Sequence, residues 1–287
     1  MTAEIVLGTA QFGTAYGVTN AVGRLDDRTV ADIVDTALRG GIRTFDTAFA
    51  YGDAEERLGR AAARSEAPIR AVTKISLADL GSSGVESYVR AAAERLGAAR
   101  LDILLHRPSD VRDPAFPGVL DELRAAQASG AIGAFGASVY DEQELEAVVE
   151  TMPDLAIVQV PGSIVDRRML DLPFLSELAR SGVEVHVRSL FLQGVLLART
   201  ADLAPRFSQV APVLAAIDRR AEELGTSRIA LLIAAVRADP LVDGLVVGAT
   251  SASEITATLD AASLAAADPL ELDGLPDEIL DPRRWVD

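Results

Sequence analysis

Side chains that can move protons lie at or just beyond the ends of three expected strands. Asp46 follows the apolar start of the segment FDTAFAYG, and Tyr51 comes five residues after it. Lys74 lies in VTKI, and His106 ends LLH. A lysine within an otherwise apolar strand is costly unless it is paired. We therefore expect Asp46, on the neighbouring strand, to be the partner of Lys74.

This set of side chains suits proton delivery to a carbonyl oxygen. A tyrosine phenol has a pKa of about 10, and a nearby ammonium favours the ionised phenol and so lowers that pKa. Asp46 would keep Lys74 charged and in place, and His106 would orient a carbonyl oxygen or share in proton delivery. We expect Tyr51 to protonate an oxygen that gains negative charge as hydride adds to the carbon.

Each of these residues also has a structural interpretation. Asp46 alone would cap a strand end, and Tyr51 alone would be a loop aromatic. The positions of Lys74 and His106 on the following strands favour the catalytic interpretation. His186, the other histidine, lies within VEVHVRS and is interpreted as structural.

The elements that must position these residues alternate along the chain. Short β-rich segments are each followed by a longer segment with helical periodicity. The expected strands are EIVLGT, RTFDTA, IRAVTKI, LDILLH, AFGASV, AIVQV, VEVHVRS and DGLVVGA. Nearly continuous apolar strands of this kind are parallel and covered by helices. The pattern predicts a closed (β/α)₈ TIM barrel, whose active site would lie at the C-terminal ends of the strands, with an open doubly wound sheet as the alternative.

The helical segments carry boundary signals and one addition. Glycines in RGG, ASG and RSG follow the last apolar position of three helices, as expected at helix C-termini. The segment PVLAAIDRRAEELG predicts an extra helix. The chain has no linker rich in Pro, Gly or Ser, so we expect one domain over residues 1–287. Its proline-marked tail, residues 268–287, is expected to pack over a barrel face.

Composition excludes several classes of function. The 287 residues have a net charge of −16, which argues against binding nucleic acid or an anionic membrane. The absence of cysteine excludes disulfides, thiolate metal sites and a cysteine nucleophile, and no metal site is expected. No signal peptide or membrane-spanning run is recognised, so a soluble cytoplasmic protein is expected.

Several motifs together resemble a known family. GIRTFDTAFAYGDAEERLG resembles the aldo-keto reductase signature, VTKI and LLHRP match the family's lysine and histidine segments in order, and GTAQFG and LVVGATSASEI resemble its first and last strands. The resemblance covers essentially the whole chain. It implies a (β/α)₈ barrel and a catalytic tetrad of Asp46, Tyr51, Lys74 and His106. It also implies NADPH or NADH bound extended across the C-terminal face, without a Rossmann glycine fingerprint.

The resemblance further implies a set of cofactor contacts. Ser138 and Gln159 match residues that hold the nicotinamide carboxamide, although both are also explained as ordinary barrel polar residues, and Val139 replaces the usual asparagine. Ser189, Leu190 and Gln193 would line the pyrophosphate. The whole set is Gly8, Thr9, Asp46, Ser138, Gln159, Arg188, Ser189, Leu190, Gln193, Gly248, Thr250, Glu254 and Thr258.

Two of these residues depart from the family pattern in a way that bears on specificity. Arg188 stands where an aromatic ring usually stacks on the nicotinamide, which points to a polar or anionic substrate or, alternatively, to a structural ion pair. Glu254 stands where Arg or Gln is common, and Thr258 where Asn is common. A carboxylate there would repel a 2′-phosphate and accept hydrogen bonds from ribose hydroxyls. We expect NADH to be tolerated or preferred.

The substrate pocket and the function remain open in part. Gln11, Phe12, Phe49 and Trp285 are expected to line the pocket, although such Phe side chains are often only packing. The expected function is reduction of an aldehyde or ketone, or the reverse reaction, by a monomer. One alternative is a cofactor-sensing regulatory protein, as in the potassium-channel β subunits that resemble this family. Another is an unrelated barrel with a Schiff base at Lys74. Short loops predict an open site with quick cofactor exchange.

Overall fold

Eight parallel strands close into a barrel in the order in which they occur in the chain, and β8 pairs with β1. The computed structural model describes residues 2–81, 83–263, 272 and 274–285. The strands are β1 (Glu4–Gly8), β2 (Thr44–Asp46), β3 (Arg70–Ile75), β4 (Arg100–Leu105), β5 (Ala134–Ser138), β6 (Ile157–Pro161), β7 (Glu184–Arg188) and β8 (Gly244–Gly248). The predicted (β/α)₈ barrel is confirmed, and the open doubly wound sheet is wrong.

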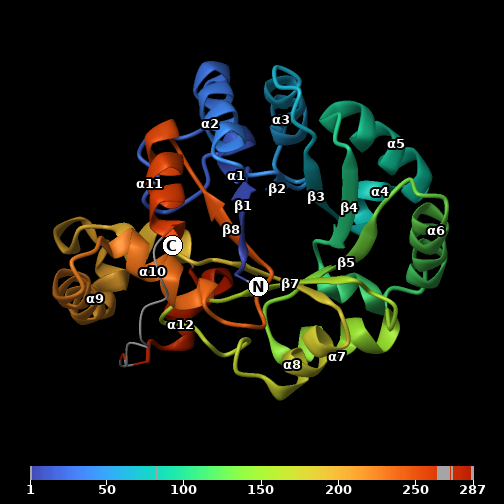
Figure 1. The fold of residues 1–287 in the computed structure, drawn as a ribbon. Helices are drawn as coiled ribbons and strands as arrows, with labels where there is room; N and C mark the ends of the chain where they lie inside the picture. The colour runs from blue at the N-terminus through green and yellow to red at the C-terminus, as the bar shows by residue number, and fades with distance from the viewer. Residues whose placement is uncertain (1, 82, 264–271, 273, 286–287) are drawn as a thin grey trace.

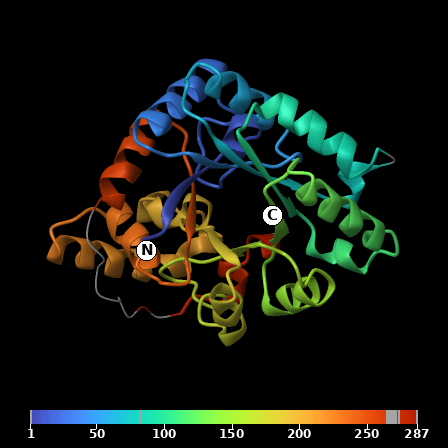
Figure 2. The same cartoon turned by 45° about the vertical axis from the view of Figure 1, so that its right-hand side comes forward.

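A ring of helices covers the strands, as Figure 1 and the turned view in Figure 2 show. The ring consists of α2 (Asp27–Arg39), α3 (Ala54–Ala62), α5 (Gly84–Leu96), α6 (Phe116–Ala128), α7 (Glu142–Thr151), α8 (Pro173–Arg180), α10 (Arg228–Arg237) and α11 (Ala252–Ala262). The expected extra helix, α9 (Ala211–Glu223), lies beyond α10 at the outside of the ring. Within the described ranges, every helix is too short or too polar to cross a membrane.

Helix ends follow the local chemistry of the sequence. Asp26, Ser227 and Ser251 accept hydrogen bonds from the first turns of α2, α10 and α11 as N-caps. Gly130 and Gly182 adopt positive φ just after α6 and α8, a conformation that costs side-chain-bearing residues energy. Shorter elements complete the chain: α1 (Ala10–Gly13), α4 (Leu77–Leu80), α12 (Asp277–Leu280), and 3₁₀ turns at Pro108–Arg112, Leu192–Leu197, Thr200–Asp202, Pro205–Val210 and Pro282–Arg284.

The core has two parts because strand side chains alternate between the two faces of the barrel wall. Outward residues such as Leu7, Phe45 and Ile103 are buried against the helices in one large cluster. Inward residues Val72 and Leu104 fill the barrel together with Ala134 and Ile157. The inward residues at the ends of the same strands are polar, and they build the two mouths of the barrel.

The described part of the tail packs on neighbouring loops. Ile279 and Leu280 of α12 are buried with Val195, which follows β7, and with residues of α9. Arg283 pairs with Asp141 and Glu144 at the start of α7. Residues 264–271, 273 and 286–287 of the expected tail lie outside the described residues.

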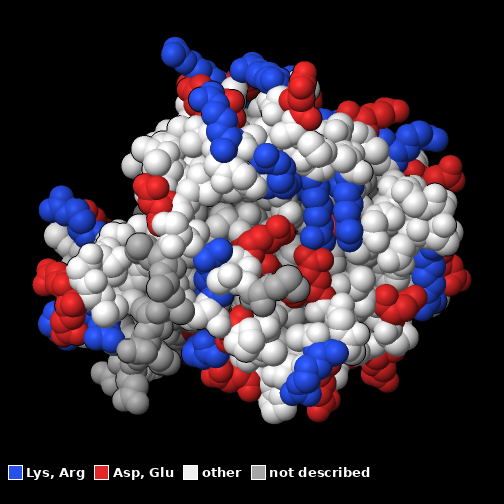
Figure 3. All heavy atoms as spheres, in the orientation of Figure 1, with Lys and Arg blue, Asp and Glu red and all other residues white. Residues whose placement is uncertain are grey.

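Charged side chains close the N-terminal mouth of the barrel. Arg70 makes two hydrogen bonds of 2.7 and 2.8 Å to Glu184 and one of 2.6 Å to Asp102. Figure 3 shows carboxylates and cationic side chains gathered at the middle of this face, near the N-terminus marked in Figure 1. Glu184 would have a raised pKa from burial alone, but hydrogen bonds from His186 and Arg70 lower its pKa to about 2. This mouth is held together by ion pairs.

Candidate functional site

A cavity of about 760 Å³ lies at the C-terminal ends of β1, β2, β6, β7 and β8. Polar residues and glycines expected to form the site make up much of its wall. Those lining it are Gly8, Thr9, Gln11, Asp46, Tyr51, Gln159, Arg188, Ser189, Leu190, Gln193, Gly248, Thr250 and Glu254. The structure therefore brings together, around one cavity, most of the residues that sequence reasoning selected.

Asp46 and Lys74 form a buried ion pair at the base of this cavity. Lys74 Nζ lies 2.6 Å and 2.7 Å from the two carboxylate oxygens of Asp46 and donates a further hydrogen bond of 3.0 Å to the carbonyl of Thr47. Only 3% of the Lys74 side chain and 5% of the Asp46 side chain are exposed. Strand register brings Asp46 opposite Val72, two residues before Lys74, so inward side chains of adjacent strands meet at one level.

A chain of hydrogen bonds extends from Asp46 across the barrel. Gln159 Nε2 donates to Asp46 Oδ2 at 2.7 Å, Ser138 Oγ donates to Gln159 Oε1 at 3.1 Å, and Arg188 Nε donates to Ser138 Oγ at 3.1 Å. The amide nitrogen of Gln159 is thus already engaged by Asp46. Ser138 and Gln159 connect Arg188 to the ion pair, and their expected contact with a carboxamide stays a prediction.

Tyr51 lies between the ion pair and His106. Lys74 Nζ is 5.4 Å from the centre of the Tyr51 ring. The rings of Tyr51 and His106 meet edge to face, with centres 6.1 Å apart. The four residues expected to form a tetrad therefore lie side by side, from β2, the loop after it, β3 and the end of β4.

Burial controls the pKa of Tyr51. Loss of solvent raises it well above its usual value, the Asp46 carboxylate raises it further, and the Arg188 guanidinium acts in the opposite direction. The expectation that Lys74 would lower this pKa is wrong for this structure, because Asp46 neutralises the ammonium and burial dominates. Tyr51 is therefore a protonated phenol at neutral pH.

Burial also lowers the pKa of His106, and the positive charge of Lys74 lowers it further. The imidazole is neutral at pH 7 and keeps one donor and one acceptor nitrogen. Burial lowers the pKa of Lys74 too, while its hydrogen-bonded partner Asp46 acts to raise it. His106 is therefore neutral and Lys74 is paired with Asp46. Near Tyr51, Arg188 is the cation that has no carboxylate partner among the residues that the structure describes.

Sequence reasoning gave Gly13 no part in positioning Tyr51. A Cβ on Gly13 would overlap the backbone carbonyl of Tyr51 and approach the amide of Ala54. Gly52, with φ of 63°, turns the chain immediately after Tyr51 and lies against Gly13. The short helix α1 therefore packs backbone to backbone against the loop that carries Tyr51.

We expect Gly13→Ala to displace Tyr51 and to lower kcat by about 10- to 100-fold, because a misplacement of about 1 Å costs that much at a reacting centre. Gly118→Ala is the matched control: Gly118, on α6, has no atom in the way of a Cβ and no positive φ that would strain an alanine. Steady-state kinetics on both variants, with melting curves, checks this. Equal kcat in the two variants would contradict the positioning role of Gly13.

Glycines and polar residues line the other end of the cavity. Gly8 and Gly248 are paired across β1 and β8, and both line the wall. Their missing side chains leave backbone open to the cavity, where a Cβ on Gly248 would meet the amide group of Gln11. Thr250 and the start of α11 continue the wall. These residues suit a long ligand with polar groups at both ends.

The start of α11 already holds a carboxylate. Glu254 accepts hydrogen bonds of 2.7 Å from the backbone N–H of Thr250 and 3.0 Å from its hydroxyl. Donors and positive helix-dipole charge at such a terminus attract anions, and here the anion is part of the protein. A second anion at this point would meet charge repulsion from Glu254.

Two loops meet beside the cavity. Ser189, Leu192 and Gln193 after β7 adopt positive φ of 64°, 48° and 52°, a conformation that costs a residue with a side chain about 1–3 kcal/mol. Gly194 packs so closely on Thr19, in the loop after β1, that a Cβ there would overlap the threonine hydroxyl. The loops after β7 and β1 therefore meet on this side of the cavity, and the expectation of an open site with quick cofactor exchange stays a prediction.

Seven expected site residues are not part of the cavity wall: Lys74, His106, Ser138, Phe12, Phe49, Thr258 and Trp285. The first three lie next to wall residues, Lys74 against Asp46, His106 against Tyr51 and Ser138 against Gln159. Phe12 is fully buried in the core because α1 turns it inward. Phe49 lies against Tyr88, outside the cavity wall, and Thr258 is buried on α11. Trp285 packs edge to face on Phe207, with ring centres 4.8 Å apart, and donates to the carbonyl of Ile279. A substrate contact by Phe12 or Trp285 is therefore a wrong expectation.

Two tyrosines at the site were missed. Tyr16 lines the cavity from the loop after β1, and burial raises its pKa, with Tyr51 as the next contribution. Tyr140, just after β5, lies between two guanidinium groups, 3.9 Å from Arg188 and 4.2 Å from Arg283. Tyr140 comes two residues after Ser138 in the sequence, and this closeness to an expected site residue was the signal that could have identified it.

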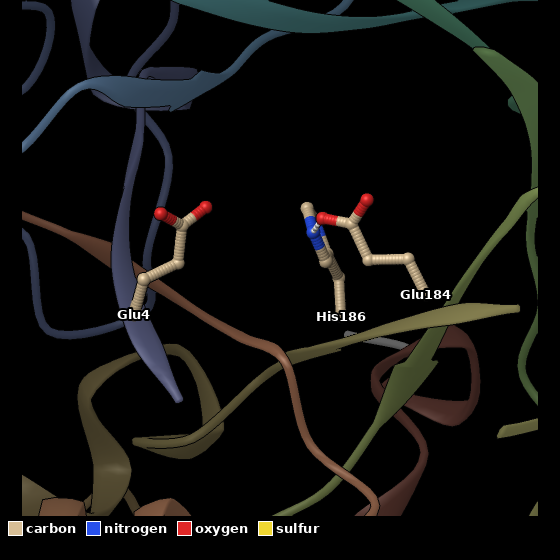
Figure 4. A group of neighbouring side chains, drawn as sticks. All are labelled: Glu4, Glu184 and His186. Atoms are coloured by element: carbon tan, nitrogen blue, oxygen red, sulfur yellow. Dashed lines mark hydrogen bonds and ion pairs between the residues drawn. The ribbon is translucent and has the colours of Figure 1, made fainter. Parts of the chain in front are cut away.

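His186 belongs to the opposite mouth of the barrel. Its Nε2 lies 2.7 Å from Glu184 Oε1, and Figure 4 shows the two side chains together, with Glu4 on β1 facing them. These residues bring possible metal-binding atoms within 4.8 Å of one another. Glu184 is already bound by Arg70 and by His186, in line with the structural interpretation of His186.

Comparisons with known proteins agree with this geometry. A family model described as the aldo/keto reductase family matches residues 4–274. An aldo-keto reductase from Mycolicibacterium vanbaalenii (strain DSM 7251) is 40% identical over 92 residues, which cover 31% of this chain and 33% of that protein. One from Mycobacterium sp. (strain KMS) is 31% identical over 170 residues, covering 58% and 60%. The matches thus span only part of the length of these curated relatives.

A solved structure supports the fold. The aldo-keto reductase AKR11C1 from Bacillus halodurans, in its holo form, superposes with a TM-score of 0.72 at 20% identity, over 94% of this chain and 89% of that one. At this identity the likeness concerns the fold alone. The family model, which matches nearly the whole chain, carries the assignment: this chain belongs to the aldo/keto reductase family.

Proposed function

We propose that this protein reduces the carbonyl group of a small aldehyde or ketone to an alcohol with NADH or NADPH, or catalyses the reverse reaction. The observation that carries the proposal is the buried Lys74–Asp46 ion pair directly beside Tyr51, at the wall of a cavity of about 760 Å³. Family membership supports the same reaction class.

In this proposal, a bound reduced nicotinamide supplies the hydride, and the residues of the chain handle the oxygen. Tyr51, protonated at neutral pH, donates its proton to the oxygen as negative charge develops there. Lys74 and Arg188 stabilise the tyrosinate that remains. Neutral His106 donates a hydrogen bond that orients the carbonyl. Asp46 holds Lys74 in place, and Gln159 holds Asp46.

The pKa directions predict different pH profiles for the two reaction directions. Reduction needs the protonated phenol, and the pKa of Tyr51 is raised. The pKa of His106 is lowered, so kcat/KM for reduction should be flat from about pH 7 to 9. Oxidation of an alcohol needs the tyrosinate and should accelerate throughout this range. A reductive kcat/KM that falls between about pH 7 and 8 would contradict a raised pKa of Tyr51.

We propose that NADH binds at least as tightly as NADPH. Glu254 already occupies the donors of Thr250 at the start of α11 and would repel the 2′-phosphate of NADPH. Glu254→Gln keeps a similar shape without the charge, and we expect it to shift the ratio of the two dissociation constants toward NADPH by about fivefold or more. Calorimetric titration of both cofactors measures this, with the exposed Glu150→Gln as a control. Tenfold tighter NADPH binding by the unsubstituted protein would refute the preference.

The reaction is tested by following oxidation of NADH in the presence of a panel of sugars and small aldehydes. Turnover by the unsubstituted protein that is lost in Tyr51→Phe would support the proposed enzymatic function. The alternative is a cofactor-sensing regulatory protein, which the missing asparagine at Val139 and the cation at Arg188 favour. Tight cofactor binding without turnover on any carbonyl would favour that alternative. A Schiff base at Lys74 would be exposed by borohydride trapping of a carbonyl compound on the protein.

A further inference from the structure

Arg188 is a half-buried cation in the cavity wall that no carboxylate of the described residues neutralises. Among the other partly buried arginines, Arg70 pairs with Asp102 and Glu184 and Arg95 pairs with Glu55. Arg237 is instead held by the backbone carbonyls of Ala3 and Ala262, on the outside of the barrel and away from the cavity wall. No described carboxylate lies within ion-pair distance of Arg188, so the alternative of a structural ion pair does not hold. A cation removed from water without a counter-ion is costly, and a ligand anion would supply what the protein does not.

The guanidinium is held in one orientation by neutral groups. Nε donates to Ser138 Oγ at 3.1 Å, Nη2 donates to the carbonyl of Val139 at 3.0 Å, and Nη1 donates to Ser189 Oγ at 3.3 Å. The ring of Tyr140 lies 3.9 Å from its central carbon. These three hydrogen bonds leave one N–H free on each terminal nitrogen, as a carboxylate with two acceptor oxygens requires.

The neighbouring carboxylates and the neighbouring cation already have partners, so they do not compete with a ligand anion for the free N–H groups of Arg188. Asp46 is bound by Lys74 and Gln159, and Glu254 is bound by Thr250. Arg283, on the other face of Tyr140, is neutralised by Asp141, Glu144 and Asp281. Arg188 lowers the pKa of both Tyr51 and His106, and at His106 it adds to the larger effect of Lys74.

We propose that Arg188 binds the carboxylate of an oxo-acid substrate whose aldehyde or keto group is reduced beside Tyr51. The inference rests on the proposed function and names its substrate class. Hydride from a reduced nicotinamide adds to the carbonyl carbon, the carbonyl π electrons move to oxygen, and Tyr51 supplies the proton. The carboxylate is unchanged and serves to position the carbonyl. A phosphate of the cofactor offers Arg188 similar anionic chemistry, and the experiment separates the two sources.

The test compares matched substrates that differ in the carboxylate alone. The probes are phenylglyoxylate with its methyl ester, and 4-carboxybenzaldehyde with methyl 4-formylbenzoate, at saturating NADH. We expect the unsubstituted protein to favour at least one acid over its ester by about tenfold or more in kcat/KM. Arg188→Gln should lower kcat/KM for that acid by about 10- to 100-fold more than for the ester, because both substrates lose the stabilisation of the tyrosinate but only the acid loses a partner for its carboxylate.

Further variants and a binding measurement keep the result interpretable. Arg188→Lys keeps the charge but loses the two-pronged geometry, and we expect an intermediate loss for the acid. Arg90→Gln removes an exposed arginine on α5 and should leave both substrates unaffected. Calorimetric titration with NADH should give the same dissociation constant for Arg188→Gln as for the unsubstituted protein within about threefold, and melting curves show that the variants fold.

Three results would contradict the binding of a substrate carboxylate by Arg188, and each has a different meaning for the proposed function. Efficient turnover of the esters with no preference for either acid would overturn the inference and leave the proposed function intact. Weakened NADH binding in Arg188→Gln with unchanged selectivity would also overturn it and would assign the guanidinium to a cofactor phosphate. Absence of turnover on every carbonyl in the wider panel, with NADH bound, would remove the proposed function and the inference with it.

Discussion

Tyr51→Phe is expected to lower kcat/KM for carbonyl reduction by about 10²- to 10⁴-fold, the range that a positioned general acid contributes. The phenol of Tyr51 lies beside the Lys74–Asp46 pair, and its raised pKa keeps it protonated at neutral pH. The substitution keeps the ring, its edge contact with His106 and the packing against Gly13. Steady-state kinetics at pH 7, with NADH binding measured by calorimetry, checks the prediction.

Tyr88→Phe is the matched control for Tyr51→Phe. Tyr88 is buried between α5 and β3, and its hydroxyl hydrogen-bonds to Glu55 outside the barrel. Its loss should affect stability and leave kcat within about threefold. If Tyr51→Phe retained more than about a tenth of the activity, another residue would be the proton donor, and His106 would be the next to examine.

Lys74→Met is expected to lower the free energy of unfolding by about 3–5 kcal/mol, since removal of one partner leaves the other buried and unpaired. The Asp46 carboxylate would keep its hydrogen bond from Gln159 but lose both contacts from the ammonium. Urea unfolding followed by circular dichroism measures the change. Activity should fall as well, because the tyrosinate formed at Tyr51 would lose a stabilising charge.

The double variant Lys74→Met/Asp46→Asn separates the two effects of Lys74→Met. It removes the unpaired carboxylate, so it should recover much of the lost stability while remaining inactive. Equal destabilisation of the single and double variants would show that the ion pair is not what holds this part of the barrel. Recovery of activity in the double variant would contradict the role of the charged pair in catalysis.

The barrel and the tetrad were predictable because they depend on short-range patterns. Each strand is an apolar run with a polar residue at its end, and parallel strands bring those ends to one mouth. The positions of Asp46, Lys74 and His106 follow from that rule without knowledge of any loop. Gly8, Thr250 and Glu254 reach the same cavity for the same reason, from β1 and the end of β8.

The residues that were misplaced or missed depend on loops and on distant packing. Phe12 was expected in the pocket, but the short helix α1 turns it into the core. Trp285 meets Phe207 through the fold of the tail, a contact between segments far apart in sequence. Gly13 matters only because the loop of Tyr51 passes against it. None of these contacts has a local signature in the sequence.

The direction of the Tyr51 pKa shift was wrong for an energetic reason. Sequence reasoning considered the ammonium of Lys74 and had no measure of burial. Desolvation shifts pKa values by up to about 3–5 units, whereas a nearby opposite charge shifts them by about 1–3. In the structure Asp46 neutralises the ammonium and itself disfavours tyrosinate, so burial decides the outcome.

The central claim is that this cavity transfers hydride from a reduced nicotinamide to a carbonyl carbon, and deuterium transfer tests it most directly. The protein would be incubated with NADH that carries two deuterium atoms at C4 and with the panel of sugars, small aldehydes and oxo acids, and the products analysed by mass spectrometry. The account predicts an alcohol with one deuterium on the former carbonyl carbon, formed by the unsubstituted protein and lost in Tyr51→Phe. Binding of NADH without deuterated alcohol from any compound in the panel would contradict it.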